Sequence, residues 1–314
     1  MTIFANLLTP EPSRYANAPR MEWPTVLLAV VIYGGWCAFT WAYASIPAWL
    51  GLPVLAILVA WHGSLQHEVL HGHPTRWRGL NDLIGIFPIS LWIPYTRYKR
   101  LHLKHHNNER LTDPIDDPES YYLTAEKWAS MSPPMRALWR FDQTLLGRVT
   151  IGPPLHILMY WVGEWQAVWR GDAGARAAWL EHLLWCVPVI WWITDICDMP
   201  FWVYLVGVML PSKSLGSVRS FAEHRALPNV HERIAIVEGS WFFGPLFLFN
   251  NLHVLHHDEP LMPWYAYLPR YRERREELLR LNNGLLYRTY FDVARRYLLK
   301  PHDVTVHPTG RVPL

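Results

Sequence analysis

Positive charge is absent from two long stretches of this chain, and that absence constrains the fold more than any other feature. All 29 Lys and Arg residues lie outside residues 21–66 and 179–211. The first stretch is long enough for two apolar helices of the roughly 20 residues that cross a bilayer, and the second, with its flanking residues, holds two somewhat shorter apolar runs. Each stretch also contains a proline near its middle, Pro47 and Pro200, where a helix would break. The sequence therefore predicts an all-α integral membrane protein with four transmembrane helices in two hairpins, at about residues 25–46, 47–66, 178–195 and 199–215.

The composition agrees with a bilayer environment. Hydrophobic residues make up 51% of the chain and charged residues 18%, whereas about 25% charged residues is usual for soluble domains. The 19 Trp suit a membrane interface, because an indole ring has an apolar body and one polar edge. Two buried helical hairpins in a soluble protein are the alternative, and the lengths and low charge favour the membrane. The net charge of +3 does not by itself indicate binding to nucleic acid.

The distribution of Lys and Arg predicts the orientation. These residues flank both hairpins and are absent from the two hairpin turns. By the positive-inside rule, both termini and the segments 67–177 and 216–314 should be cytoplasmic. The chain is thus expected to be a single multi-pass domain, residues 1–314, in a bacterial inner membrane, with a helical cap on the cytoplasmic side. Its first two dozen residues have no apolar run ending in a cleavage site, so no removed signal peptide is expected.

Three histidine clusters are the strongest chemical signal. The first has the spacing HxxxH and the other two have the spacing HxxHH. On a helix, residues three and four positions apart share a face, so the imidazoles of each cluster should point together. Imidazole is the commonest metal-binding side chain, and each cluster follows an apolar segment on the predicted cytoplasmic side. The clusters are therefore expected to converge on a metal site: His67 and His71; His102, His105 and His106; His253, His256 and His257.

Other readings of these histidines remain open. The first cluster, with Glu68, also fits HExxH, the zinc-protease signature in which the glutamate is the general base. An intramembrane zinc protease would leave the two HxxHH clusters unexplained. A metal transporter is a second alternative, but transporters place their ligands near the bilayer midplane, often in repeated halves. The isolated histidines are expected to be ordinary hydrogen-bonded side chains: His156, His182, His231, His302 and His307.

The three clusters, called histidine boxes below, occur together with two apolar hairpins. This pattern resembles the integral-membrane fatty acid desaturase and hydroxylase superfamily, over about residues 61–259. The resemblance implies a non-haem di-iron centre held by the boxes, with O2 as co-substrate. It also implies one more ligand between the fourth span and the last box, and His224 is the candidate there. The implied metal ligands are thus nine: His67, His71, His102, His105, His106, His224, His253, His256 and His257.

Several polar residues next to the boxes could hydrogen-bond to ligating imidazoles and fix their tautomers. An acidic segment follows the second box, and such segments are frequent at this place in the family. A solvated acidic loop is the alternative. The candidates are Glu68, His73, Asp113, Asp116, Asp117 and Asp258.

The activity implied by the resemblance is O2-dependent oxidation of an unactivated C–H bond in a lipid, foremost desaturation of a fatty acyl chain. Related members are hydroxylases, ketolases or fatty acid decarboxylases that form terminal alkenes, and the boxes do not distinguish these outcomes. The sequence does not identify catalytic residues beyond the metal ligands. The chain shows no haem, flavin or iron–sulfur motif of its own, so a separate electron donor such as a ferredoxin is expected. Two basic runs could dock it: Arg97, Lys99, Arg100 and Lys104, and Arg270, Arg272, Arg274 and Arg275. Ordinary positive charge on the cytoplasmic side of the membrane is the alternative explanation of both runs.

Overall fold

The computed structural model describes residues 20–106 and 110–308, which fall into two compact units. Unit one holds the described residues of 1–99 together with 156–215 and 263–265; unit two holds the described residues of 100–155, 216–262 and 266–314. Most of the first two dozen residues, where no signal peptide was expected, and both chain ends lie outside the described residues. The single domain expected for 1–314 stays a prediction.

Four helices in the described part of the chain are long and apolar enough to cross a membrane, which confirms the predicted fold class. Many of their large apolar side chains are exposed, among them Leu27 on the first helix and Leu184 on the third. In a chain that spans a bilayer, such side chains can face lipid. The four spans are Trp23–Trp41, Ala48–Leu70, Ala173–Ile196 and Phe201–Glu223.

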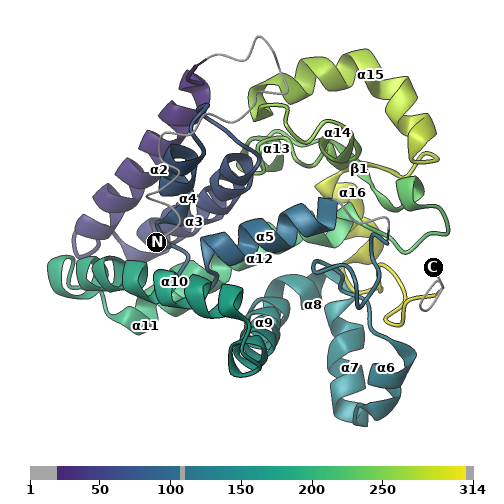
Figure 1. The fold of residues 1–314 in the computed structure, drawn as a ribbon, viewed down its shortest axis with the longest axis horizontal. Coiled ribbons are helices and arrows are strands. Elements are labelled where there is room, and N and C mark those ends of the chain that lie inside the picture. The colour runs from purple at the N-terminus through teal and green to yellow at the C-terminus, as the bar shows by residue number, and fades with distance from the viewer. Residues whose placement is uncertain (1–19, 107–109, 309–314) are drawn as a thin grey trace. The chain divides into compact units, whose positions relative to one another are not determined.

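In unit one the first hairpin consists of α2 (Trp23–Trp41) and α3 (Ala48–Leu70), which lie side by side (Figure 1). The short helix α4 (Arg78–Ile86) follows and contacts α3. Gln66 Nε2 donates to the carbonyl of Gly85 at 2.7 Å, and Tyr33 Oη donates to that of Ile84 at 2.6 Å. These bonds satisfy polar groups that could find no water among apolar helices, and they hold the end of α3 in place.

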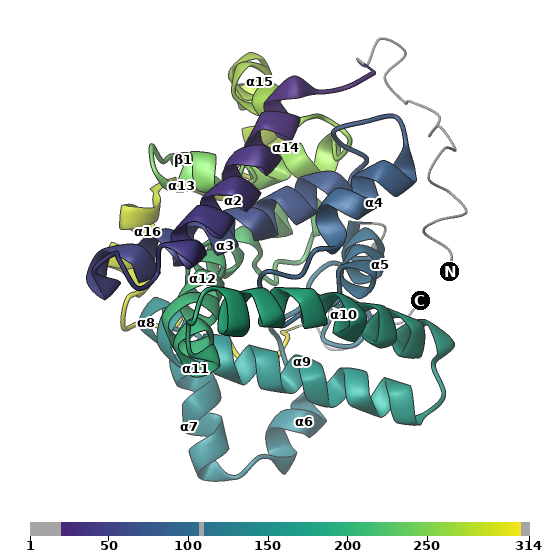
Figure 2. The same ribbon diagram turned by 90° about the vertical axis from the view of Figure 1, so that its left-hand side faces the viewer.

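The second hairpin of unit one begins after α9 (Gly152–Trp169), whose residues from His156 onward belong to this unit. Asp172 caps α10 (Ala173–Trp191) by accepting from the backbone N–H groups of Gly174 and Ala175. The π-helical turn η1 (Trp192–Ile196) ends the third span. Figure 2 shows the chain passing from α10 into the fourth span, which consists of α11 (Phe201–Tyr204), η2 (Leu205–Met209) and α12 (Leu210–Glu223).

Two helices extend beyond the expected spans, because each continues past its apolar residues. The second span was expected to end at about residue 66, but α3 continues to Leu70, so His67 lies within the helix. The fourth was expected to end at about residue 215, but α12 continues to Glu223. Apolarity marks the stretch that can lie in hydrocarbon, whereas a helix continues as long as its backbone hydrogen bonds do.

Unit two consists of short helices around one pair of strands. The parallel strands β1 (Ile236–Gly239) and β2 (Leu286–Thr289) pair Ile236 with Leu286 and Val237 with Tyr287, a small sheet that the sequence did not predict. Strands of four residues carry too little alternation to be detected. The helices are the end of α5 (Tyr95–His106), α6 (Ala125–Ser130), α7 (Pro133–Asp142), α8 (Leu145–Thr150), the end of α12, η3 (Val230–Arg233), α13 (Phe243–Leu246), α14 (His253–Asp258), α15 (Tyr267–Leu281) and α16 (Tyr290–Tyr297). A turn of 3₁₀ helix, η4 (Trp264–Ala266), lies between α14 and α15.

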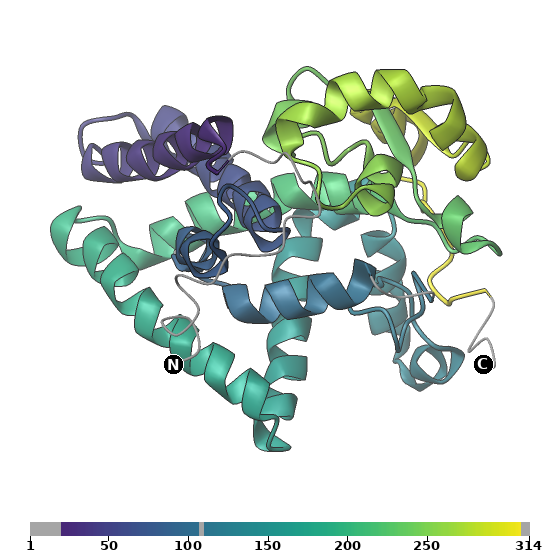
Figure 3. The same cartoon turned by 45° about the horizontal axis from the view of Figure 1, so that its top comes forward.

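The main core of unit two fixes the helix that carries the third histidine box. Leu252, Val254 and Leu255 from the start of α14 pack with Tyr267 and Leu278 of α15, and all five are buried. Figures 1 and 3 show α15 lying beside the much shorter α14. A helix of six residues has little stability by itself, so this packing determines where the imidazoles of α14 lie.

Candidate metal centre

The second histidine box occupies the last turn and a half of α5 in unit two. His102 and His106 have their ring centroids 4.6 Å apart, as expected for residues one turn apart. Nδ1 of His102 lies 2.7 Å from a carboxylate oxygen of Glu119, and Nδ1 of His105 lies 2.8 Å from one of Asp117. A protonated Nδ1 donates to each carboxylate, and this tautomer leaves the Nε2 lone pair free to bind a cation.

The acidic segment after α5 places its side chains in different roles. Asp117 accepts from the backbone of Thr112 as well as from His105, so one carboxylate joins the loop to the box. Asp113 instead accepts from backbone N–H groups of its own loop, and Asp116 pairs with Arg110 at 2.6 Å. Glu119 was part of the acidic segment but not among the candidate residues. Its distance of 17 positions from His102 gives no periodic signal, because the loop between them is irregular.

The third box lies on α14 of the same unit, and all three imidazoles are directed into unit two. Nε2 of His256 lies 2.8 Å from Nε2 of His106, and Nε2 of His257 lies 3.2 Å from Nε2 of His253. The second ring nitrogens of His253 and His256 have other partners. Nδ1 of His253 lies 2.9 Å from Asn250 Oδ1, and Nδ1 of His256 lies 2.9 Å from Tyr267 Oη. The sequence analysis missed Asn250 and Tyr267, which are uncharged and of types found throughout the chain.

His224 lies directly after α12, and the structure brings it to the third box. Its Nε2 is 3.0 Å from that of His253, and its ring centroid is 5.0 Å from that of His105. Backbone bonds on both sides hold it: Ala235 N donates to Glu223 O, and Arg225 N donates to Arg233 O. No helical spacing links His224 to a box, so sequence periodicity alone could not select it.

Two groups of imidazoles in unit two have the donor set of a metal site. His105, His224, His253 and His257 each offer a nitrogen within 4.8 Å of the others, and so do His102, His106 and His256 among themselves. The buried atoms His105 Nε2 and His224 Nδ1 have no hydrogen-bond partner among the described residues. Where two Nε2 atoms face each other, only one of them can carry the shared proton. A cation bound by several lone pairs satisfies such a set, so these residues fit a metal ion.

Burial keeps most of these imidazoles neutral. It lowers the pKa of His253 and of His257 well below the ordinary histidine value, and lowers that of His224 to about 3. His105 differs: burial lowers its pKa, but Glu119 and Asp117 outweigh that effect and raise it to about 9. Partial burial raises the pKa of Glu119, yet His102 and His105 hold that pKa well below its ordinary value. A neutral imidazole is the metal-binding form, and a carboxylate behind it strengthens it as a donor.

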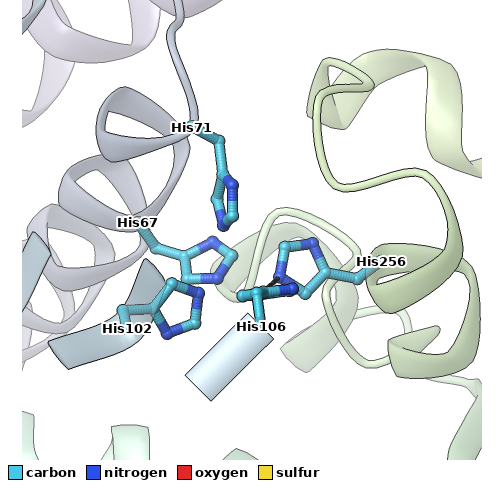
Figure 4. A group of neighbouring side chains, drawn as sticks. All are labelled: His67, His71, His102, His106 and His256. Carbon is cyan, nitrogen blue, oxygen red and sulfur yellow. Dashed lines mark hydrogen bonds between the residues drawn. The ribbon is translucent and has the colours of Figure 1, made fainter. Parts of the chain in front are cut away.

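The first box belongs to unit one, where His67 lies in the last turn of α3 and His71 caps that helix. Their ring centroids are 4.9 Å apart, so both can offer a nitrogen to one ion. Figure 4 draws this pair at the end of α3, and also His102, His106 and His256 from α5 and α14.

A separate buried group in unit one surrounds the glutamate of this box. Glu68 accepts from the backbone N–H of Trp264 at 3.0 Å. His73 lies with its Nε2 4.0 Å from Glu68, while its Nδ1 is 2.8 Å from Glu22 at the start of α2. Glu22 was not a candidate, since 51 residues separate it from His73. The three side chains hold the turn after α3 against the start of α2.

The remaining candidates have partners away from the imidazole groups. Asp258 pairs with Arg274 of α15. Among the isolated histidines, His182 lies 3.1 Å from the carbonyl of Leu91 and His302 lies 2.9 Å from Tyr287 Oη. His307 lies 3.1 Å from Thr112 Oγ1. These contacts are those of hydrogen-bonded polar side chains.

Together, the four apolar helices and the buried histidine groups define an integral membrane protein with a histidine-rich site that fits metal. The family model for fatty acid desaturases matches residues 44–291, and the chain belongs to that family. A Delta(12)-oleate desaturase from Trichosanthes kirilowii is 25% identical over 243 residues, which cover 64% of this chain. The chain spans 61% of the length of that relative.

Proposed function

We propose that this protein uses O2 to desaturate a fatty acyl chain at a histidine-ligated di-iron centre. The observation that carries the proposal is the convergence of His105, His224, His253 and His257 inside unit two, behind which carboxylate and amide groups fix the imidazoles. Family membership supports the reaction class, and the oleate desaturase relative supports a fatty acyl substrate.

We assign the ligands in two sets. His105, His224, His253 and His257 would hold one ion, and His102, His106 and His256 would contribute to the other. The family pattern implies His67 and His71 of the first box as further ligands. Iron rests on the family, since imidazole also suits zinc and copper.

Bound iron would supply the redox chemistry that activates O2 and oxidises the C–H bond. The chain's own residues prepare the site for it. Asp117 and Glu119 hold protons on Nδ1 of His105 and His102, which directs each Nε2 to the metal. Burial of His102, His105 and His253 excludes water that would compete for the ions.

The balance of the reaction requires an external reductant. Removing two hydrogens from a –CH2–CH2– unit supplies two of the four electrons that reduce O2 to two waters. The other two electrons and two protons must come from outside, and we propose a ferredoxin-like carrier as their source. The acyl chain would come from the bilayer that the apolar helices span.

The test is product analysis. The protein would be expressed in a lipid-producing host, and total fatty acids measured by mass spectrometry against a host that expresses His253→Ala. A new double bond absent from the control supports desaturation. If the product were a hydroxylated acid, a ketone or a terminal alkene, the proposed di-iron site would stand but the proposed reaction would be wrong. Lipids that are unchanged with both proteins would contradict the proposal.

A further inference from the structure

A tyrosine outside the histidine boxes contacts one of the proposed ligands. Tyr267, the first residue of α15, has its Oη 2.9 Å from His256 Nδ1. Both side chains are buried, with 4% and 1% of their surfaces exposed. A phenol in such a place normally has a hydrogen-bonding role, because its hydroxyl cannot be satisfied by bulk water.

The geometry assigns the two nitrogens of His256 to different roles. Nε2 lies 2.8 Å from His106 Nε2, on the side where the imidazoles gather. An imidazole that binds a metal through Nε2 carries its proton on Nδ1. Tyr267 Oη lies 2.9 Å from that nitrogen, so Nδ1–H donates and the phenol oxygen accepts. Without the hydroxyl, a buried N–H donor would lose this acceptor.

The position of Tyr267 is fixed by the rest of α15. Its ring packs in the core of unit two with Leu252 and Leu255. Farther along the helix, Arg270 donates to Glu259 at 2.8 Å, and Arg274 pairs with both Asp258 and Glu259 at the end of α14. A side chain held by packing and by an ion-pair network cannot easily move away from the imidazole, so its hydroxyl can determine the orientation of that ring.

The acceptors behind the two boxes also differ in charge. Behind α5 they are carboxylates, Glu119 and Asp117, whereas behind α14 they are the amide of Asn250 and the phenol of Tyr267. A carboxylate draws the Nδ1 proton more strongly than a neutral oxygen does, and so makes the imidazole a stronger donor. A phenol therefore orients His256 without that increase in donor strength.

We propose that Tyr267 is a positioning residue that holds the Nδ1–H tautomer of His256 and thereby presents its Nε2 to the metal. This inference rests on the proposed function, since it requires His256 to bind a metal ion. Tyr267 does not touch substrate in this role; it acts through the imidazole.

The test compares Tyr267→Phe with Tyr271→Phe. Tyr271 lies one turn farther along α15, is equally buried at 5% exposure, and donates its hydroxyl to Glu238 rather than to a histidine. Each variant loses one buried hydroxyl from the same helix. Iron per chain would be measured on purified protein during titration with a chelator, together with the Mössbauer spectrum of the iron-57 form. Tyr267→Phe should lose iron at about 10–100-fold lower chelator concentration, as is typical when a hydrogen bond behind a ligand is removed. Its spectrum should change at one iron, while Tyr271→Phe keeps the wild-type titration and spectrum.

A double-mutant cycle separates this role from simple packing. In a His256→Ala background, Tyr267→Phe should have no further effect on iron retention, because the group through which it acts is gone. Wild-type iron retention and spectrum in Tyr267→Phe would overturn the inference, and so would equal iron loss in both phenylalanine variants. Wild-type protein that binds no iron would instead overturn the proposed function and, with it, this inference.

Discussion

Asp117 lies 2.8 Å from Nδ1 of His105, and both side chains have only 1% of their surface exposed. Such a pair is shielded from solvent, so the carboxylate interacts with the imidazole in a medium of low polarity. The same carboxylate accepts from the backbone of Thr112, which ties its position to the loop after α5. The pair therefore determines both the tautomer and the orientation of one proposed ligand.

Asp117→Asn should weaken the site while it preserves the shape of the side chain. The amide is neutral and draws the Nδ1 proton less strongly than a carboxylate does, so we expect metal affinity or activity to fall by about 10–100-fold. Asp116→Asn is the matched control, because Asp116 lies in the same loop and pairs with half-buried Arg110 instead of a histidine. Iron content and product formation would be measured for both variants. Equal losses at the two positions would show that loop charge, rather than the bond to His105, matters.

His224→Ala tests the ligand that only the family pattern selected. We expect it to lose iron and nearly all activity, since its Nε2 lies 3.0 Å from that of His253 within the quartet. His302→Ala is the control: His302 is also buried, but its Nε2 faces Tyr287 Oη at 2.9 Å. Losing that bond should cost about 1–3 kcal/mol of stability and leave iron per folded chain unchanged. Full activity of His224→Ala would remove this residue from the site.

The histidine boxes could be found from sequence because their spacing matches a helix, and α5 and α14 do carry the second and third boxes. The apolar spans were predictable for a similar reason, since length and lack of charge determine which segments can lie in lipid. The acceptors were not predictable: Asn250, Tyr267 and Glu119 reach their histidines through turns and irregular loops. Such positions depend on tertiary packing, which has no period in the sequence. Whether the nine histidines bind iron stays a prediction.

Glu68→Gln separates an oxygenase from a zinc protease. In a protease of the HExxH type, this glutamate is the general base, and glutamine would abolish activity. Here Glu68 accepts from the backbone N–H of Trp264, a bond that a glutamine oxygen can replace. We expect lipid oxidation by Glu68→Gln to stay within a few-fold of wild type, whereas His67→Ala is inactive. Proteolysis of a membrane substrate that requires Glu68 but tolerates His105→Ala would contradict the di-iron proposal.

The basic runs expected to dock an electron donor are largely engaged within the chain. Arg97 pairs with Glu164, Lys99 with Asp82, and Arg274 and Arg275 with glutamates. Exposed members without an ion pair among the described residues are Arg100, Lys104 and Arg272. We expect Arg100→Glu and Arg272→Glu to raise the donor concentration for half-maximal turnover several-fold at low salt, and this difference should shrink as salt rises.

The control for donor docking is Arg295→Glu, an exposed arginine of α16 outside both runs. It changes the net charge of the protein by the same amount. If Arg295→Glu affected the donor dependence as strongly as the other two reversals, overall charge rather than a docking surface would explain the result. Donor dependence that stayed constant with salt in wild-type protein would argue against electrostatic docking.

The orientation of the four spans can be tested at the two hairpin turns. The turn between α2 and α3 and the turn between η1 and α11 contain no Lys or Arg, so both should lie outside the cytoplasm. A reporter inserted near Trp49 or Cys197 should be active only outside, and one fused after Leu314 only inside. Adding two lysines to the turn before Trp49 should reduce correct insertion, because positive charge opposes export of that turn. The same number of added aspartates should have little effect, and a cytoplasmic signal from either turn in the unaltered chain would overturn the four-span orientation.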